Sequence, residues 1–258
     1  MDRISACLIT FNEEENLPRA LESLRGIADE IVVLDSGSRD RTREIAERCG
    51  AKVLVREWTN FAEQKNAAAA AASFDWILSL DADEEISPEL RESLLEWKKQ
   101  EPQCAVYEFA RRAWYLGAWV RHTRWYPDYQ RKLFRRDKTR FEVPEHATVK
   151  YQGKVGRLPG DLLHYTVRSY EEHVAKVEGI TTRQARYLYD AGRRSWRGAM
   201  WFAPPWNWFN NYVLCLGFLD GYRGWLISRM AARATWLKFK KLGKLIEEQQ
   251  HKVLQRPA

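Results

Sequence analysis

The chain has 258 residues, enough for one substantial hydrophobic core or for one domain with an appendage. Hydrophobic residues make up 45% and charged residues 30%, a globular balance that excludes a wholly disordered chain. The net charge of +7 is uneven: residues 1–100 carry 13 Lys and Arg against 21 Asp and Glu, and residues 101–258 carry 29 against 14. An acidic first part suits a metal-binding pocket, and a basic second part suits an anionic partner.

The four cysteines are scattered, and neither a Cys-x-x-Cys pair nor a histidine cluster is present to complete a zinc site. This pattern favours a reducing cytoplasm. The first residues run directly into a strand pattern rather than a secretory signal, and no apolar run approaches the roughly 20 residues that span a bilayer. We therefore expect a protein that is soluble or peripheral to a membrane.

Strand patterns alternate with helical patterns over the first hundred residues, which is typical of a sheet built from βαβ units. A further helix is expected to begin at Ser87-Pro88 and to end near Lys99. Most of the strands are continuous apolar runs, which indicates burial on both faces, and ligands of such sheets bind at the carboxyl ends of the strands. The predicted strands are Ile4–Thr10, Glu30–Asp35, Lys52–Val55 and Trp76–Asp81, and the predicted helices are Pro18–Arg25, Asp40–Cys49 and Phe61–Ala72.

The sheet is expected to continue beyond residue 105, with strands at Tyr107–Phe109 and Tyr129–Phe134. After His164-Tyr165 the sequence changes to helical periodicity, first over Ser169–Ala191 and later in a stretch that ends near Gln250. We therefore predict two domains, residues 1–165 and residues 166–258, of which the second is helical, basic and rich in tryptophan.

Two carboxylates, Asp81 and Asp83, follow the fourth predicted strand. Because side chains repeat every second residue along an extended backbone, both project to one side and can bind a cation. A hard divalent ion held by one or two carboxylates keeps positions open for substrate phosphates, so a diphosphate-bearing donor is the natural partner. A solvated turn explains the same triplet, and Glu84-Glu85 next to it fits that interpretation too.

The segment that follows the second strand has two interpretations. Asp35 can hydrogen-bond a ribose or a base, and Gly37 allows the backbone to approach a ligand closely. Equally, Ser38 or Asp40 can simply cap the next helix. No glycine-rich dinucleotide or P-loop motif is present, so a metal ion would have to neutralise a bound diphosphate.

Four blocks of sequence, in this order and spacing, resemble the family 2 glycosyltransferases, which share the GT-A fold: Leu8–Glu13, Val32–Thr42, Gln64–Ala67 and Leu80–Glu84. The resemblance continues through Arg131–Arg136 and Val143–His146, and Gly217–Gly221 looks like the lipopolysaccharide-core glucosyltransferases of bacteria. It implies an α/β fold of GT-A type, with a mixed, mainly parallel sheet flanked by helices. A Rossmann-like nucleotide-binding half and a C-terminal helical extension would complete this fold.

The resemblance also implies roles for individual residues. Residues 1–100 would form the donor site and residues 101–165 the acceptor side. Ser36 stands where many family members have a second aspartate, so the contact with the nucleobase at this position is left open. Asp83, in the DXD motif Asp81-Ala82-Asp83, would hold Mn²⁺ or Mg²⁺. The nucleotide-sugar donor would be bound by Thr10, Asn12, Glu13, Asp35, Lys65, Asn66 and Asp81.

Inverting transfer needs a base for the acceptor hydroxyl and an electrophile that stabilises the departing nucleoside diphosphate. The resemblance points to Glu145 as the base, with Asp128 in reserve, although Glu145 could equally pair with a nearby arginine. The family's His-Glu pair keeps its glutamate here, and the imidazole moves to His146. The implied reaction transfers a hexose, glucose from UDP, to a lipopolysaccharide inner-core or other lipid-linked saccharide.

Nine of the twelve tryptophans lie between Trp114 and Trp236, interleaved with arginines. Such rings can stack on a saccharide, sit at a membrane interface or pack in a core. The segment Trp225–Leu245 mixes apolar and basic residues as an interfacial helix would, and as a helix packed on its own domain would. Because a lipid-linked acceptor lies in an anionic leaflet, we expect peripheral attachment to the cytoplasmic face of a bacterial inner membrane.

Two other functions stay open. A nucleotidyltransferase acting on sugar phosphates could use a similar sheet and metal, but Asn12–Glu15 stands where its phosphate loop would be expected. A non-catalytic module could bind nucleic acid or a membrane through the basic half. That hypothesis leaves the four N-terminal blocks unexplained, so we expect no nucleic-acid partner.

Overall fold

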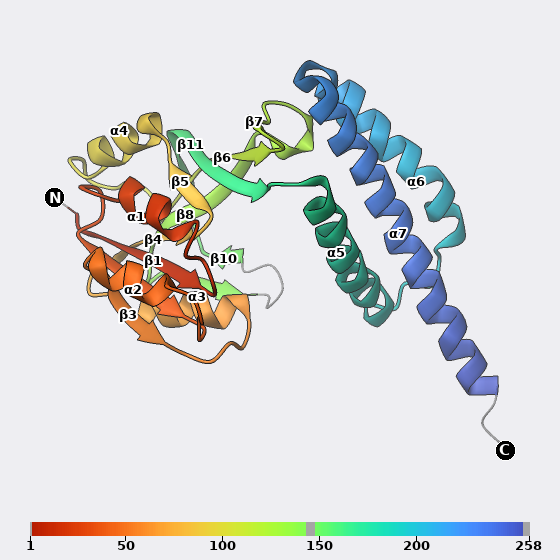
Figure 1. Cartoon of the computed structure of the whole chain (residues 1–258), viewed down its shortest axis with the longest axis horizontal. Helices are drawn as coiled ribbons and strands as arrows, with labels where there is room; N and C mark the ends of the chain where they lie inside the picture. Colours follow the sequence, from red (N-terminus) through yellow and green to blue (C-terminus); the bar gives the residue numbers. More distant parts are fainter. Residues whose placement is uncertain (1, 143–147, 255–258) are drawn as a thin grey trace. The chain divides into compact units, whose positions relative to one another are not determined.

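The computed structural model describes residues 2–142 and 148–254, which fall into two units (Figure 1). The first unit comprises Met1–Arg112 and Asp128–Tyr165, and the second comprises Ala113–Pro127 and Thr166–Ala258. The sequence-based division also falls after residue 165, but it assigns residues 113–127 to the first domain. In the structure that segment belongs to the second unit, because Tyr115 and Val120 are buried in a cluster with residues of the C-terminal helices.

The parallel part of the sheet contains the four strands predicted for the first hundred residues, with the predicted bounds. Strand β1 pairs in parallel with both β2 and β4, and β2 pairs in parallel with β3, so the spatial order is β3-β2-β1-β4. The helices differ from their predicted bounds by at most two residues at either end, and α1 begins one residue earlier than predicted. The elements are β1 (Ile4–Thr10), β2 (Glu30–Asp35), β3 (Lys52–Val55) and β4 (Trp76–Asp81), with α1 (Leu17–Ser23), α2 (Thr42–Arg48) and α3 (Phe61–Ala70) between them.

The sheet continues beyond β4 through antiparallel strands. In the described chain the order is β3-β2-β1-β4-β8-β6-β11-β5, and β7 pairs with β6. The expected α/β class, with a mixed sheet, flanking helices and a C-terminal helical region, is confirmed. The further elements are β5 (Glu84–Ile86), α4 (Pro88–Trp97), β6 (Val106–Tyr115), β7 (Ala118–Trp119), β8 (Asp128–Arg135) and β11 (Val155–Val167), with a separate pair β9 (Arg140–Glu142) and β10 (Thr148–Lys150).

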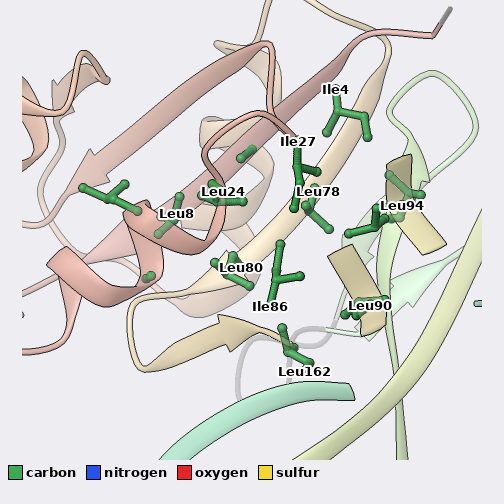
Figure 2. Packing of buried hydrophobic residues seen from close by; sticks show 14 of the residues in the cluster. Ile4, Leu8, Leu24, Ile27, Leu78, Leu80, Ile86, Leu90, Leu94 and Leu162 are labelled. Atoms are coloured by element: carbon green, nitrogen blue, oxygen red, sulfur yellow. The ribbon is translucent and has the colours of Figure 1, made fainter. Parts of the chain in front are cut away.

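Both faces of β1, β4 and most of β2 are buried, as their continuous apolar sequences predict, whereas the edge strand β3 is partly exposed. Figure 2 shows Ile4 and Leu8 of β1 and Leu78 and Leu80 of β4 in one cluster with Leu90 and Leu94 of α4. The alternate residues of the same strands pack with the alanine-rich helix α3 on the other face. Since each fully buried aliphatic side chain contributes roughly 1.5–3 kcal/mol, these strands form a rigid base for the residues at their carboxyl ends.

The second unit is mainly helical. Its long helix α7 buries Leu226, Met230, Phe239 and Leu242 against neighbours that include residues of α5. Of the two interpretations of Trp225–Leu245, packing on its own domain therefore describes the apolar side of this helix. Among the described residues, no helix combines the length and the apolar character that a membrane crossing needs. The elements are η1 (Thr123–Trp125), α5 (Tyr170–Asp190), α6 (Arg197–Phe209), η2 (Asn210–Leu214), η3 (Gly217–Asp220) and α7 (Gly221–Leu254).

The motif Gly217–Gly221, which resembles the lipopolysaccharide-core enzymes, connects the start of α7 to the loop at residues 121 and 122 within the second unit. The Asp220 carboxylate accepts the backbone N–H groups of Arg121 and His122, at 3.2 and 2.8 Å, and lies 3.1 Å from Nδ1 of His122. A Cβ atom on Gly224 would lie 1.8 Å from the carbonyl oxygen of Gly217. Glycine is therefore required where α7 begins, because the backbone of η3 passes directly over it.

Candidate functional site

The predicted site residues Thr10, Asp35 and Asp81 are the last residues of β1, β2 and β4. Thr10 is paired with Asp35 across β1 and β2, and Ile9 is paired with Asp81 across β1 and β4. All three side chains therefore lie on one rim of the sheet. The direction of strand order reverses between β1 and β4, and such a switch point is where open α/β sheets bind ligands.

Asp81 is held between two ammonium groups. Nζ of Lys65 lies 2.7 Å from its Oδ1 atom, and Nζ of Lys132 lies 2.8 Å from its Oδ2 atom. Lys132 also contacts Oε2 of Glu84 at 2.6 Å, and this glutamate oxygen accepts the backbone N–H of Asp81 at 2.9 Å. Lys132 and Glu84 are buried, whereas the Asp81 side chain is 30% exposed, so the charge cluster is covered on one side and open on the other.

The charges of this cluster stabilise one another. Burial tends to raise the pKa of Asp81, but Lys132 and Lys65 outweigh it and hold the pKa well below its ordinary value. Burial tends to lower the pKa of Lys132, but Asp81 and Glu84 outweigh it and raise that pKa. Asp81 is therefore ionised and already neutralised by lysines, which makes it a weaker ligand for a cation than an unneutralised carboxylate.

Asp83, the second carboxylate of the DXD motif, has an imidazole partner. Nε2 of His164 lies 3.1 Å from Oδ2 of Asp83, and the backbone N–H of Tyr165 donates to the Asp83 carbonyl at 2.9 Å. Burial tends to raise the pKa of Asp83, but the contact with His164 outweighs it, and the net shift is downward. A carboxylate and an imidazole can serve as two ligands of a divalent cation, with the other positions left for phosphate or water. Within residues 2–142 and 148–254 no group of three such side chains is positioned to hold an ion.

A cavity of about 480 Å³ lies beside the end of β1. Trp58 and Phe61 meet edge to face in its wall, with ring centroids 4.8 Å apart, and both rings are partly exposed. Aromatic walls with a few polar groups are typical of a site for a planar ligand such as a nucleobase. The cavity is lined by Ile9, Thr10, Phe11, Glu13, Ser36, Trp58 and Phe61. It thus combines three residues that the sequence singles out with aromatic residues that the sequence analysis missed.

A larger cavity of about 590 Å³ lies at the opposite edge of the sheet. Its lining includes Asp2, before β1, Trp76, the first residue of β4, and Arg135, the last residue of the antiparallel strand β8. None of the predicted site residues lines this cavity. Its size therefore gives no reason to move the site away from the carboxyl ends of the parallel strands.

Asp35 forms hydrogen bonds within the turn that follows β2. It is fully buried, and its Oδ1 atom accepts the backbone N–H groups of Gly37 and Ser38 at 3.0 and 2.9 Å. Its Oδ2 atom accepts the hydroxyl groups of Thr10, at 3.1 Å, and of Ser38. Both oxygens of Asp35 therefore shape the rim. Asp40 contributes to the start of α2, as the second interpretation predicts, because its Oδ1 atom accepts the backbone N–H of Thr42 at 3.0 Å, although Arg41 itself provides no side-chain cap.

Asn12 and Glu13 join the loop after β1 to the loop after β2. The backbone N–H of Asn12 donates to Oγ of Ser38 at 2.8 Å, and Oδ1 of Asn12 accepts the backbone N–H of Arg39 at 2.9 Å. The backbone N–H of Glu13 donates to Oγ1 of Thr42 at 2.8 Å. Asn12 adopts the left-handed backbone region, with φ of 55°, which asparagine tolerates better than most residues. These contacts support the floor of the cavity.

Asn66 connects α3 to β9. Its Nδ2 atom donates to the carbonyl oxygen of Phe141, and its Oδ1 atom accepts the backbone N–H of the same residue, both at 2.9 Å. The neighbouring Lys65 points to Asp81 on the rim. Of these two predicted donor-binding residues, the structure places Lys65 in the charge cluster and gives the side-chain amide of Asn66 a structural partner.

Of the two candidates for the catalytic base, Glu145 and Asp128, the structure describes the surroundings of Asp128. Glu145 lies outside the described residues. Asp128 begins β8, and its Oδ2 atom accepts two hydrogen bonds from Arg111, at 3.0 and 2.7 Å, while its Oδ1 atom accepts one from Gln130 at 2.8 Å. Arg111 also approaches Glu84, at 3.6 Å. Asp128 is therefore linked through a single arginine to the charge cluster around Asp81.

Residues 5–152 match the family model described as Glycosyl transferase family 2. The chain is 29% identical to an uncharacterized glycosyltransferase of Rickettsia felis, over 94% of this chain and 90% of that protein. It is 30% identical to the lipopolysaccharide core biosynthesis glycosyltransferase LpsC of Rhizobium meliloti, over 84% of this chain and 82% of that protein. A crystal structure of glucosyl-3-phosphoglycerate synthase from Mycobacterium tuberculosis, with Mn²⁺, UDP and glucosyl-3-phosphoglycerate, is 28% identical over 44% of each chain, with a TM-score of 0.36. That structural overlap is too small to transfer site positions. Because the family match covers more than half of the sequence, the chain belongs to glycosyl transferase family 2 and is a glycosyltransferase.

Proposed function

We propose that this glycosyltransferase transfers a hexose, namely glucose from a UDP donor, to a lipopolysaccharide inner-core or other lipid-linked saccharide. The transfer inverts the configuration at the anomeric carbon and needs a divalent cation. The observation that carries the proposal is the rim of the sheet, where an aromatic-walled cavity and the Asp83–His164 pair follow β1 and β4. The similarity to LpsC supports the class of acceptor.

The donor would lie along this rim. The base would occupy the cavity beside Trp58 and Phe61, with Thr10 and Glu13 as polar neighbours. Asp35, Asn12 and Asn66 would contribute by holding the surrounding loops and β9 in place. Asp81 and Lys65 would lie on the ribose and diphosphate side, where the ammonium group of Lys65 offers a counter-charge to phosphate.

Asp83 and His164 would hold the Mn²⁺ or Mg²⁺ ion. Their donor set fits such an ion, because a carboxylate and an imidazole leave several positions free for diphosphate oxygens. When bound, the ion neutralises charge on the departing nucleoside diphosphate. The backbone hydrogen bond from Tyr165 to the Asp83 carbonyl holds β11 beside the motif. The Asp83 carboxylate and the His164 imidazole would therefore stay aligned.

Glu145 is the proposed base, and Asp128 is the alternative. In the reaction the base takes the proton of the acceptor hydroxyl while this oxygen attacks the anomeric carbon, and the bond from that carbon to the diphosphate breaks. Asp128 shares its oxygens with Arg111 and Gln130, which favours a positioning role for it. Glu145→Gln should therefore abolish turnover, and Asp128→Asn should reduce it less.

The proposal is tested by combining donor binding with product analysis. UDP and Mn²⁺ together should stabilise the full chain against thermal unfolding, and Asp83→Asn should remove that stabilisation. UDP-glucose should be converted to UDP with a hexose added to a purified core acceptor, as seen by mass spectrometry. Release of pyrophosphate instead of a nucleoside diphosphate, or UDP binding that Mn²⁺ and Asp83→Asn leave unchanged, would overturn the proposal.

A lipid-linked acceptor would place this reaction at the cytoplasmic face of the inner membrane. The second unit contains 18 Lys and Arg against 7 Asp and Glu, a net charge of +11, whereas the first unit is net acidic. Such a charge supports association with anionic lipid, because each basic residue near an anionic surface contributes about 1 kcal/mol. Binding of the chain to anionic vesicles is the corresponding test.

A further inference from the structure

Helix α6 is apolar on the side that faces away from its own unit. Phe202, Trp206 and Phe209 follow one another at intervals of four and three residues, so they share one face of the helix. Their exposed fractions are 79%, 61% and 41%. In a helix of a globular protein the apolar face is normally the buried one.

The side of α6 that faces its own unit is partly polar. Asn207 donates from Nδ2 to Oγ1 of Thr235 in α7 at 2.7 Å. Asn211, just after α6, is buried, and its Oδ1 atom accepts the backbone N–H of Arg124 at 3.1 Å. Figure 1 shows α6 running beside α7, in agreement with their contacts. The inner side of α6 therefore combines amides with small apolar residues such as Ala199 and Ala203, whereas its largest aromatic rings face outward.

Exposed apolar residues also occur beyond α6, from the end of η2 through η3 to the start of α7. Leu214, Phe218, Leu219 and Tyr222 are all exposed, although Asp220 between them is mostly buried by its contacts with the loop at residues 121 and 122. The motif thus holds its carboxylate inward and its apolar side chains outward. A patch of this kind on a folded protein marks an interaction site rather than ordinary surface.

The charge around this patch is positive. Arg193, Arg194 and Arg197 precede the aromatic stripe at the start of α6, and all three are exposed. Aromatic rings flanked by arginines are the composition of surfaces that lie at the boundary between lipid head groups and acyl chains.

We propose that the outward face of α6, with Phe202, Trp206 and Phe209, lies in the plane of an anionic bilayer surface, together with the apolar tip at Leu214–Tyr222. The rings enter the head-group boundary, and the arginines at the start of α6 contact anionic phosphates. A bilayer fits better than a second copy of this chain, because two copies of a unit with net charge +11 repel each other. This surface belongs to α6, whereas the apolar side of α7 is core.

Flotation of the full-length chain with lipid vesicles tests this proposal. The wild type should float with vesicles of phosphatidylglycerol and phosphatidylcholine, and much less with phosphatidylcholine alone. Phe202→Ser/Trp206→Ser should lower the partition coefficient on the order of tenfold to a hundredfold, since two apolar side chains no longer leave water. Tyr187→Ser is the matched control, because Tyr187 is an aromatic residue of α5 with 65% exposure outside the patch, and it should bind like the wild type.

The other outcomes decide against the proposal. Equal flotation of the double variant and the wild type, or equal loss in Tyr187→Ser, would overturn it. So would a concentration-dependent dimer, seen by light scattering, that the double variant abolishes while neither protein binds vesicles. Thermal stabilisation by UDP and Mn²⁺, measured without lipid, should be the same in wild type and double variant. A failed vesicle result with intact donor binding would therefore leave the proposed chemistry untouched.

Discussion

Nε2 of His164 lies 3.1 Å from Oδ2 of Asp83, although the two residues are 81 positions apart in the sequence. The antiparallel pairing of β11 with β5 sets His164 opposite Glu84 and so brings the imidazole beside the DXD motif. We expect His164→Ala to weaken the Mn²⁺-dependent part of UDP binding at least about tenfold, whether His164 binds the ion or orients Asp83. Calorimetric titration with UDP measures this loss.

The control for His164→Ala is the same titration in the presence of EDTA. Without the ion, the variant and the wild type should bind UDP with equal affinity, because His164 does not line the cavity. Equal affinities in Mn²⁺ as well would show that His164 takes no part in holding the ion.

Lys132 and Glu84 form a buried ion pair, and removing only one of the two charges should lower the free energy of unfolding. Lys132→Met leaves Glu84 without its closest cation and removes one of the two lysines at Asp81, so we expect the free energy of unfolding to fall by about 3–5 kcal/mol. Lys132→Met combined with Glu84→Gln should cost less than the sum of the two single changes. Urea unfolding of the four proteins measures the coupling, and strictly additive costs would contradict a coupled cluster.

Asn66 should affect stability more than donor affinity. Asn66→Ala removes two hydrogen bonds to the backbone of Phe141, and we expect a loss of about 1–3 kcal/mol in the free energy of unfolding because those backbone groups lose their partner. The Kd for UDP of the folded protein should stay within about twofold of the wild type. A much larger change in Kd at unchanged stability would indicate that Asn66 contacts the donor, as the family resemblance implies.

The sequence predicts the parallel part of the sheet well, because its strands are apolar runs bounded by polar residues. Strands β1 and β4 have the predicted bounds, and their carboxyl ends carry Thr10 and Asp81 as expected. Local pattern is sufficient there, since both faces of these strands are buried by neighbouring helices. The rim that carries the candidate site could therefore be predicted from sequence.

The partners of the rim residues could not be predicted from the sequence. Lys132 and His164 reach Asp81 and Asp83 through antiparallel strands that are distant in sequence, and periodicity does not encode strand register at that range. The same limit applies to helices. Sequence pattern indicates which residues of α6 and α7 are apolar, but not which of them another element covers, so Phe202 is exposed and Leu226 is buried.

His173 should make the second unit less stable in mild acid. It is buried, with Nδ1 2.8 Å from the hydroxyl of Tyr115, and burial, assisted by Lys176 and opposed by Glu172, lowers its pKa from 6.5 to about 4. Between these values the unfolded chain binds a proton that the folded chain does not, so stability falls as the pH drops through this window and is unaffected above it. We expect His173→Gln to reduce the loss of unfolding free energy between about pH 7 and about pH 5 by roughly 2 kcal/mol relative to the wild type. Identical pH dependence of urea unfolding in both proteins would mean that His173 is protonated in the folded state as readily as in the unfolded one.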